Sequence, residues 1–282
     1  MKAEEFPISD DFWSVGGKDE KQFPKLKSEN GGSWTVQVSS YVRHTDFPES
    51  QMPSPRTYHA STLVDRFMVV VGGESNSSDL NDFWALDLEQ KKWYKPDIFG
   101  QESFIPKRFH TANTIQGTKV ITFGGCHSEY VHLNDLNIFE MKDFVESQSA
   151  KVICTKVNIS LNVPSTRWGH AAAVMDQDKL FILGGRNDSD VSDIHCYDIV
   201  SNNWRQIEVG HQIPSPRRRH SCIFVSNCLV MFGGFDGEFF NDINIMDMSA
   251  QHQAVQSEEP NNERDFSNLV NNFMDHDIVF EV

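Results

Sequence analysis

The stretch from Arg167 to Asp193, R-W-G-H-A-A-A-V-M-D-Q-D-K-L-F-I-L-G-G-R-N-D-S-D-V-S-D, holds an arginine, a histidine, a Gly-Gly pair and an aspartate in that order. The same order occurs four times along the chain. Between the first glycines of successive pairs the steps are 52, 60 and 49 residues (72 to 124 to 184 to 233). A period near 50 residues is typical of radially stacked β-blades, so a residue that recurs in every copy is first a structural residue.

We expect the repeated residues to build the frame of each unit. Copy by copy, they are Arg56, His59, Gly72, Gly73 and Asp82; Arg108, His110, Gly124, Gly125 and Asp135; Arg167, His170, Gly184, Gly185 and Asp193; and Arg217, His220, Gly233, Gly234 and Asp242.

Each repeat has the pattern of four antiparallel strands. A short apolar run precedes each Gly-Gly pair, at residues 67–71, 120–123, 180–183 and 229–232, which predicts a strand buried on both faces. A second strand comes before this run, and a third, with alternating apolar residues, follows the glycines. Outer strands with Trp93 and Trp204 complete the first and third repeats. Four such strands make one blade of a β-propeller, so the expected fold class is all-β.

The double glycine, the following N-D or S-D step and the spaced tryptophan resemble kelch repeats over roughly residues 34 to 250. Two copies depart from the pattern, because neither the second nor the fourth has the outer tryptophan. Residues 152–157, V-I-C-T-K-V, are a candidate outer strand for the second. The stretch G-S-W-T-V-Q-V, with Trp34, is a candidate to close the fourth blade from the N-terminal side. Because kelch proteins usually have more than four blades, a fragment of a larger propeller is the alternative.

The composition excludes several classes of protein. The formal net charge of −15 argues against a non-specific nucleic-acid binder, which needs a basic face. No apolar run approaches the ~20 residues of a membrane span, and the N-terminus has no apolar core of a signal peptide. The five cysteines show no metal-ligand spacing, so small buried hydrophobic residues are the default interpretation. We expect a protein of the cytoplasm or the nucleus, with no nucleic-acid or membrane partner.

Both ends of the chain differ from the repeats. Residues 1–31 form a polar N-terminal segment that we expect to be poorly ordered, residues 32–250 the propeller, and residues 251–264 an acidic linker. Residues 265–282, D-F-S-N-L-V-N-N-F-M-D-H-D-I-V-F-E-V, resemble the start of a BTB domain. Kelch repeats followed by BTB are the order found in leucine-zipper-like regulator proteins. The alternative is a C-terminal tail that packs on the propeller.

The repeated arginines and histidines do not predict a catalytic site. All four sets occupy one register, which favours hydrogen bonds to loop backbone and neighbouring blades, because buried polar groups must be paired. The four aspartates are expected to be turn and inter-blade hydrogen-bonding groups. A copper radical oxidase on a kelch propeller is the remote enzyme alternative. The G-x-S-x-G, P-loop and H-E-x-x-H motifs are absent from the sequence, so we expect no enzyme activity, no metal and no cofactor.

The function is expected on the face where the loop before each inner strand meets the loop after each Gly-Gly pair. Arginine and aromatic residues, which anchor protein interfaces, gather there. The candidate protein-binding residues are Tyr58, Arg108, Arg167, Trp168, Arg186, Asn187, Arg217, Arg218, Phe235 and Phe239, with Phe109 beside them.

The only cationic cluster is R-R-R-H from Arg217, which we interpret either as one structural and two solvated arginines or as a seat for an acidic or phosphorylated peptide. We expect a client-recognition module of a kelch–BTB adaptor for a cullin-type ubiquitin ligase. The alternative is a stand-alone kelch scaffold in cytoskeletal or signalling assembly.

Overall fold

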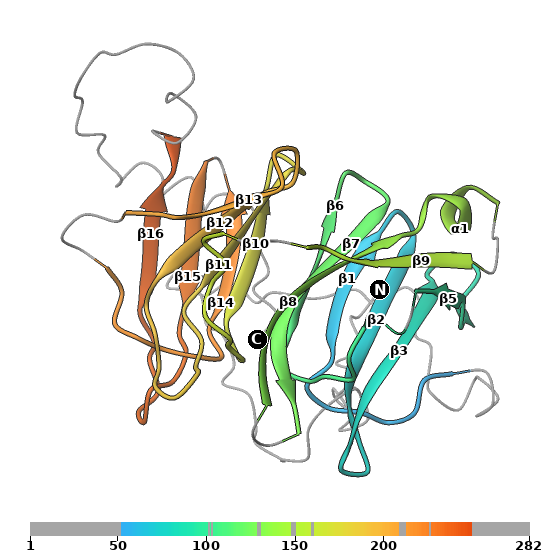
Figure 1. Cartoon of the computed structure of the whole chain (residues 1–282), viewed down its shortest axis with the longest axis horizontal. Coiled ribbons are helices and arrows are strands. Elements are labelled where there is room, and N and C mark those ends of the chain that lie inside the picture. The colour runs from blue at the N-terminus through green and yellow to red at the C-terminus, as the bar shows by residue number, and fades with distance from the viewer. Residues whose placement is uncertain are drawn as a thin grey trace, which may run out of the picture. The chain divides into compact units, whose positions relative to one another are not determined.

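Four β-sheets follow one another along the chain, one for each sequence repeat (Figure 1). The computed structural model describes residues 52–249, except 101, 103, 129–130, 148–150, 159–160, 209–212 and 226. Each sheet begins with an inner strand and proceeds outward by antiparallel pairing with the next strand in sequence. This arrangement confirms the all-β expectation: the described chain is a kelch-type β-propeller with four blades.

The first and third blades have the expected four strands. The first consists of β1 (Ala60–Val64), β2 (Phe67–Ser75), β3 (Ser78–Asp87) and β4 (Lys92–Tyr94), and the third of β10 (Ala171–Met175), β11 (Lys179–Leu183), β12 (Ile194–Asp198) and β13 (Asn203–Gln206). The two tryptophans of the outer strands face equivalent partners, since Trp93 lies opposite Leu86 and Trp204 opposite Tyr197.

The second blade has a fifth strand. It contains β6 (Thr111–Ile115), β7 (Lys119–His127), β8 (Val131–Glu140) and β9 (Lys151–Lys156), with the short helix α1 (Lys142–Ser147) before β9. The strand expected at residues 152–157 is therefore present as β9. Beyond it, β5 (Asp97–Phe99) from the connection between blades pairs with β9 in parallel, and no pattern in the sequence predicted this strand.

The fourth blade shows three strands within the described residues. These are β14 (Ser221–Val225), β15 (Cys228–Phe232) and β16 (Ile243–Asp247). The expected closing strand with Trp34 lies outside the described residues, as do the N-terminal segment, the linker and the BTB-like stretch.

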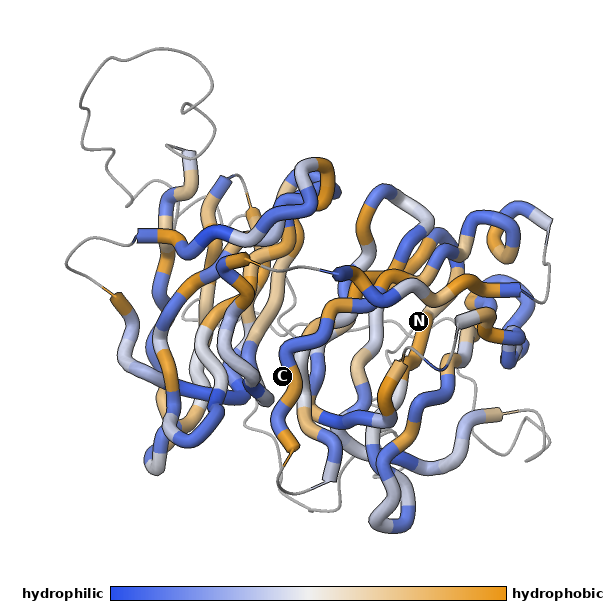
Figure 2. The backbone as a smooth tube through the Cα atoms, in the orientation of Figure 1, coloured by the Kyte–Doolittle hydropathy of each residue, from blue (hydrophilic) through white to orange (hydrophobic). Residues whose placement is uncertain are grey.

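The hydrophobic core lies between the blades. β1 packs against β6, β6 against β10, and β10 against β14, so each inner strand contacts the next one. One cluster joins Val69, Val71 and Phe83 of the first blade to Val120 and Phe139 of the second. Apolar residues accordingly follow the strands and polar residues the turns (Figure 2). The apolar runs before the glycines are central strands with mostly buried residues on both faces, as predicted.

In the first three blades, the first glycine of the pair is required because the next blade approaches it closely. Gly184 has a φ of +54°, and a Cβ atom there would lie 2.8 Å from the carbonyl oxygen of Arg217 and 2.9 Å from the imidazole of His220. Both residues belong to the following blade. Gly72 and Gly124 meet the equivalent groups at 2.8 to 3.0 Å. Only glycine combines this left-handed conformation with such a close approach.

This contact predicts the effect of a single methyl group. Gly184→Ala should lower the free energy of unfolding by about 2–3 kcal/mol, because strain at positive φ adds to the clash with the neighbouring loop. The matched control is Gly117→Ala: Gly117 has a φ of +74°, but a Cβ atom there would have no neighbour within 4 Å. The control should lose only the conformational part, about 1 kcal/mol. Equal losses in chemical denaturation would show that the blade contact contributes nothing.

Candidate protein-binding face

The candidate protein-binding face is formed by the loops that lead into the inner strands. The first residue of each loop bonds that loop to its own blade. We define the leading loops as residues 56–59, 107–110, 167–170 and 217–220. In the third, Arg167 donates from Nη1 and Nη2 to both carboxylate oxygens of Asp193, at 2.6 and 2.9 Å, and to the carbonyl of Gly184 at 3.0 Å. Arg56 with Asp82 and Arg217 with Asp242 repeat this bidentate geometry.

In the second blade a lysine occupies this position, which corrects one prediction. Lys107, not Arg108, is the equivalent of the repeated arginine, and its Nζ lies 2.6 Å from both carboxylate oxygens of Asp135. The side chain is fully buried, and its ammonium lies 5.0 Å from the ring centre of Phe104. Burial lowers the pKa of Lys107, while Asp135 opposes that shift.

The residue two positions before Lys107 also differs from its equivalents in the other repeats. The guanidinium groups of Arg56, Arg167 and Arg217 also bond the serine two residues earlier, through its carbonyl and its hydroxyl. In the second blade that residue is Ile105, which offers no hydroxyl, so an ammonium with fewer donors suits the site.

The four aspartates act within their blades rather than between them, which corrects their predicted inter-blade role. Besides the arginine or lysine, each accepts a second bond from the residue two positions later, namely Trp84, Asn137, His195 and Asn244. The bond from Arg217 is the main reason why the pKa of Asp242 falls to about 2. The carboxylate of Asp242 therefore remains charged at neutral pH and holds its leading loop in place.

In the second, third and fourth blades, the histidine that ends the leading loop packs against the preceding blade. The imidazoles of His110, His170 and His220 lie against the first glycine of the preceding blade. His170 also lies 3.0 Å from the hydroxyl of Thr111 on the previous inner strand. Burial, reinforced by the cation at the start of the same loop, lowers the pKa of each; His220 falls to about 4, and His110 and His170 lie well below their ordinary value.

The third residue of each leading loop has a different role from the first residue. Tyr58, Phe109, Gly169 and Arg219 hold this position, and all have φ between +56° and +61°. Their main chains form a continuous hydrogen-bonded line: Phe109 N donates to Tyr58 O at 3.0 Å, Gly169 N to Phe109 O at 3.0 Å, and Arg219 N to Gly169 O at 2.6 Å. Because backbone bonds fix this line, its side chains can vary without loss of the fold.

Aromatic rings and arginines form one row across the four blades, which we call the aromatic row. Tyr58 stacks on Phe109 with ring centres 3.9 Å apart, and Phe109 lies 5.1 Å from Trp168. The guanidinium of Arg218 lies between Trp168 at 5.6 Å and Phe235 at 4.8 Å. Beyond it, Phe239 contacts Phe235 and remains 88% exposed. The row is exposed at its two ends, Tyr58 and Phe239, and half-buried between them. A row of this composition can bind a protein segment through rings and cations.

Most of the predicted arginines are already engaged. Arg108 pairs with Asp79 at 3.0 Å and Glu74 at 2.9 Å, and Arg218 pairs with Asp190 at 2.6 Å. Arg186 shares that carboxylate at 3.2 Å. These pairs stabilise contacts between neighbouring loops, so removing Arg218 and Arg186 together would leave a buried carboxylate without its partners.

Arg219 belongs to the R-R-R-H run that the sequence analysis singled out, but it was not among the individual candidate residues of this face. It is exposed, it forms no ion pair within the described residues, and its guanidinium lies 5.2 Å from the ring centre of Phe109 and 5.6 Å from that of Trp168. Aligning the four leading loops by their final histidine would have revealed it, because Arg219 then matches Tyr58, Phe109 and Gly169.

The remaining predicted residues have separate positions. Arg167 and Arg217 are buried in the frame, so their predicted contact with a client was wrong. Asn187 shapes its own loop, since its side-chain carbonyl oxygen accepts bonds from the main-chain nitrogens of Asp188 and Ser189.

The two loops that were expected to share one face do so. In every blade the leading loop forms a β-bridge to the residue after the Gly-Gly pair: Thr57 with Glu74, Arg108 with Cys126, Trp168 with Arg186, and Arg218 with Phe235.

Two findings on the described residues bear on other classes of site. No group of three or more histidine, cysteine, aspartate or glutamate side chains in this part of the chain could hold a metal ion. The one helix in the described residues, α1, is too short to cross a membrane.

Comparison with known proteins identifies the family. The sequence profile described as the KLHDC2/KLHL20/DRC7 Kelch-repeats domain matches residues 7–148 and 143–274. The chain therefore belongs to this kelch-repeat family.

Three relatives show the range of proteins that contain such repeats. Kelch domain-containing protein 10 of Rattus norvegicus is 25% identical over 239 residues, which cover 81% of this chain and 55% of the relative. Adagio protein 3 of Arabidopsis thaliana is 27% identical over 205 residues (68% and 31%). The leucine-zipper-like transcriptional regulator 1 homolog of Drosophila melanogaster is 28% identical over 188 residues (65% and 19%). The chain spans about half the length of the kelch domain-containing 10 proteins that it matches.

The buried lysine gives a test of the frame that holds this face. Lys107→Met should lower the free energy of unfolding by about 3–5 kcal/mol, because the buried side chain of Asp135 would lose its cationic partner. The matched control is Lys142→Met, since the Lys142 side chain is 66% exposed and lies 3.9 Å from Glu146. The control should change stability by no more than about 0.5 kcal/mol. A Lys107 variant as stable as the control in urea denaturation would refute the role of the ion pair.

The buried histidines predict loss of stability in mild acid. Their folded pKa values lie below that of an unfolded histidine, about 6.5, so the unfolded chain binds more protons as the pH falls from 6.5 towards 4. The free energy of unfolding should therefore fall over this window, by up to about 1.4 kcal/mol per pH unit for each histidine. Asp242, with its folded pKa of about 2, loses its contribution only below about pH 4. Thermal melts of His220→Gln should show a shallower pH dependence than the native chain, and identical slopes would contradict the assignment.

Proposed function

We propose that this protein is a non-catalytic protein-interaction module that binds a client segment along the aromatic row. Membership of a kelch-repeat family supports a role in protein binding. The observation that carries the proposed site is the position of Arg219, an exposed cation without an ion pair among the described residues, placed over Phe109 and Trp168. The aromatic rings of Phe109 and Trp168 lie beside the guanidinium of Arg219. Flat ring faces favour a client whose backbone or side chain packs flat against the row.

The charge of the row indicates the chemistry of the client. Arg108 and Arg218 are neutralised by Asp79 and Asp190, so Arg219 is the cation available to an incoming group. An acidic or phosphorylated side chain would pair with it, and the adjacent rings would reduce the exposure of that pair to water. The proposed client is therefore a protein segment with an acidic group flanked by apolar or aromatic residues.

The proposal predicts that one exposed arginine decides binding. Arg219→Ala should weaken capture of client proteins by about tenfold or more, while Arg205→Ala, at another exposed arginine, on β13, should leave it unchanged. Both variants should keep the circular dichroism spectrum and melting temperature of the native chain. The measurement is affinity capture with quantitative mass spectrometry at two salt concentrations, since binding should weaken as salt rises. Clients that bind Arg219→Ala as well as the native chain would place recognition elsewhere.

We further propose that the molecule serves as the client-recognition part of a kelch–BTB adaptor for a cullin-type ubiquitin ligase. The resemblance of residues 265–282 to the start of a BTB domain supports this role, as does the similarity to a leucine-zipper-like regulator homolog. The alternative is a stand-alone kelch scaffold in cytoskeletal or signalling assembly. Co-purification of a cullin with the full-length gene product distinguishes the two roles, because a scaffold would recover clients without it.

A further inference from the structure

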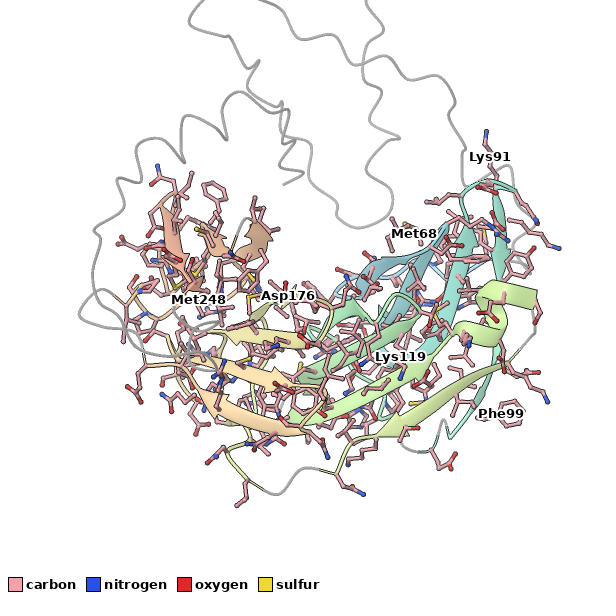
Figure 3. The ribbon with its side chains drawn as sticks, turned by 90° about the horizontal axis from the view of Figure 1, so that it is seen from above. Met68, Lys91, Phe99, Lys119, Asp176 and Met248 are labelled. Atoms are coloured by element: carbon pink, nitrogen blue, oxygen red, sulfur yellow. The ribbon has the colours of Figure 1, made fainter. Side chains whose placement is uncertain are left out.

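The third residues of the leading loops contact one another in two different ways. In the first and second blades they are neighbours, and the rings of Tyr58 and Phe109 stack with centres 3.9 Å apart. The guanidinium of Arg219 lies 5.2 Å from the ring centre of Phe109, although these two residues belong to the fourth and second blades. The third blade, marked by Asp176 in Figure 3, lies between them, because its inner strand β10 packs against both β6 and β14. Arg219 therefore crosses the third blade to reach this ring.

Gly169 is the residue that Arg219 crosses. It is the buried third residue of the leading loop of the third blade, and its carbonyl oxygen accepts a hydrogen bond from Arg219 N at 2.6 Å. A Cβ atom on Gly169 would lie 3.6 Å from Cγ of Arg219 and 3.5 Å from Cβ of Arg218. The stem of the Arg219 side chain thus passes directly beside the place where a side chain of residue 169 would begin. Atoms beyond that Cβ would compete with Arg219 for the same space.

The other three leading loops show that this position accepts a side chain. The φ of Gly169 is +61°, and Tyr58, Phe109 and Arg219 adopt values of +57°, +57° and +56°. The contacts of a Cβ atom on Gly169, at 3.5 to 3.7 Å, are ordinary van der Waals distances, whereas a Cβ atom on Gly184 would lie 2.8 Å from a carbonyl oxygen. The missing side chain at residue 169 therefore has its main consequence for Arg219 and not for the packing of the blades.

We propose that Gly169 is a positioning residue of the aromatic row, because its missing side chain lets Arg219 place its charge over Phe109 and Trp168. The cation then lies in the middle of the row, with aromatic rings of the first and fourth blades beyond it on either side. The effect of Gly169 on binding rests on the proposed function, whereas its effect on the placement of Arg219 does not. A client that fits this arrangement has its acidic group between two apolar side chains and not at the end of the segment.

Two variants of Gly169 separate the effect of the side chain from that of the backbone. Gly169→Ala and Gly169→Leu impose the same strain at positive φ, but only leucine has atoms beyond Cβ that compete with the stem of Arg219. The Nε–H resonance of Arg219 in NMR spectra of the free protein distinguishes them, because aromatic ring currents shift a proton held over a ring. This resonance should lie upfield in the native chain and in Gly169→Ala, and should return to the position of a solvated arginine in Gly169→Leu.

A titration with phenyl phosphate measures the effect on binding. This probe combines an anion with an aromatic ring, the two groups that the row is proposed to bind. Its dissociation constant, followed at the indole N–H of Trp168, should rise about tenfold or more in Gly169→Leu and in Arg219→Ala, and only about twofold in Gly169→Ala. The double variant Gly169→Leu with Arg219→Ala should bind no more weakly than Arg219→Ala alone, because both changes act through one guanidinium.

Several results would overturn the proposal. An Arg219 resonance that stays upfield in Gly169→Leu, or that is not upfield in the native chain, would show that residue 169 does not hold the guanidinium over the rings. Equal losses of binding in the alanine and leucine variants would assign the effect to the backbone. Additive losses in the double variant would show that Gly169 acts independently of Arg219. Native-like binding in Gly169→Leu, with weak binding in Arg219→Ala, would show that the placement has no effect on recognition.

Failure of the proposed function gives a different result. In that case phenyl phosphate does not bind the native chain, or binds Arg219→Ala equally well. The upfield position of the Arg219 resonance, which is measured without any ligand, still decides whether Gly169 positions the guanidinium.

Discussion

The main-chain hydrogen bond from the second glycine of one blade to the leading loop of the next is the contact on which the rest of the structure depends. In the part of the chain that the structure describes, it occurs three times, from Gly73, Gly125 and Gly185, at 2.8 to 2.9 Å. It requires the first glycine to leave room for the loop and the histidine to fill the space beside it. The packing of the blades and the position of the binding face both follow from this contact, because the leading loop belongs to each of them.

Within this frame, charge is used in two ways. The first residue of each leading loop is a buried or nearly buried cation paired with an aspartate of its own blade, so it fixes the loop but is unavailable to a partner. The third residue is hydrogen-bonded to its neighbours through its main chain, so the type of its side chain differs between repeats without loss of these bonds. The same loop therefore carries a constant structural end and a variable outward residue, which is how a repeat can keep its fold while changing what it binds.

The sequence was sufficient for the features that repeat. Periodicity predicted the strands around each Gly-Gly pair, the all-β class and the face shared by two loops. It did not predict β5, because three residues in a connecting segment carry no periodic signal. The repeat pattern also assigned Arg108, instead of Lys107, as the cation that pairs with Asp135. Lys107 forms the equivalent ion pair inside the blade, but a search for a repeated arginine does not find a lysine. On sequence alone, Arg167 and Arg217 were assigned both to the frame and to the binding face, and their burial leaves only the frame role.

The case of the R-R-R-H run shows why register matters more than clustering. Three adjacent arginines suggested one basic patch, yet each has a different environment. Arg217 is buried against Asp242, Arg218 joins two blades through Asp190, and Arg219 lies exposed over two aromatic rings. Their charges are equal, so what separates their roles is the position of each in the leading loop. In a repeat protein, the position of a charged residue within the repeat determines whether it belongs to the frame or is available to a partner. An alignment of the four repeats on their shared histidine reveals that position from the amino-acid sequence alone.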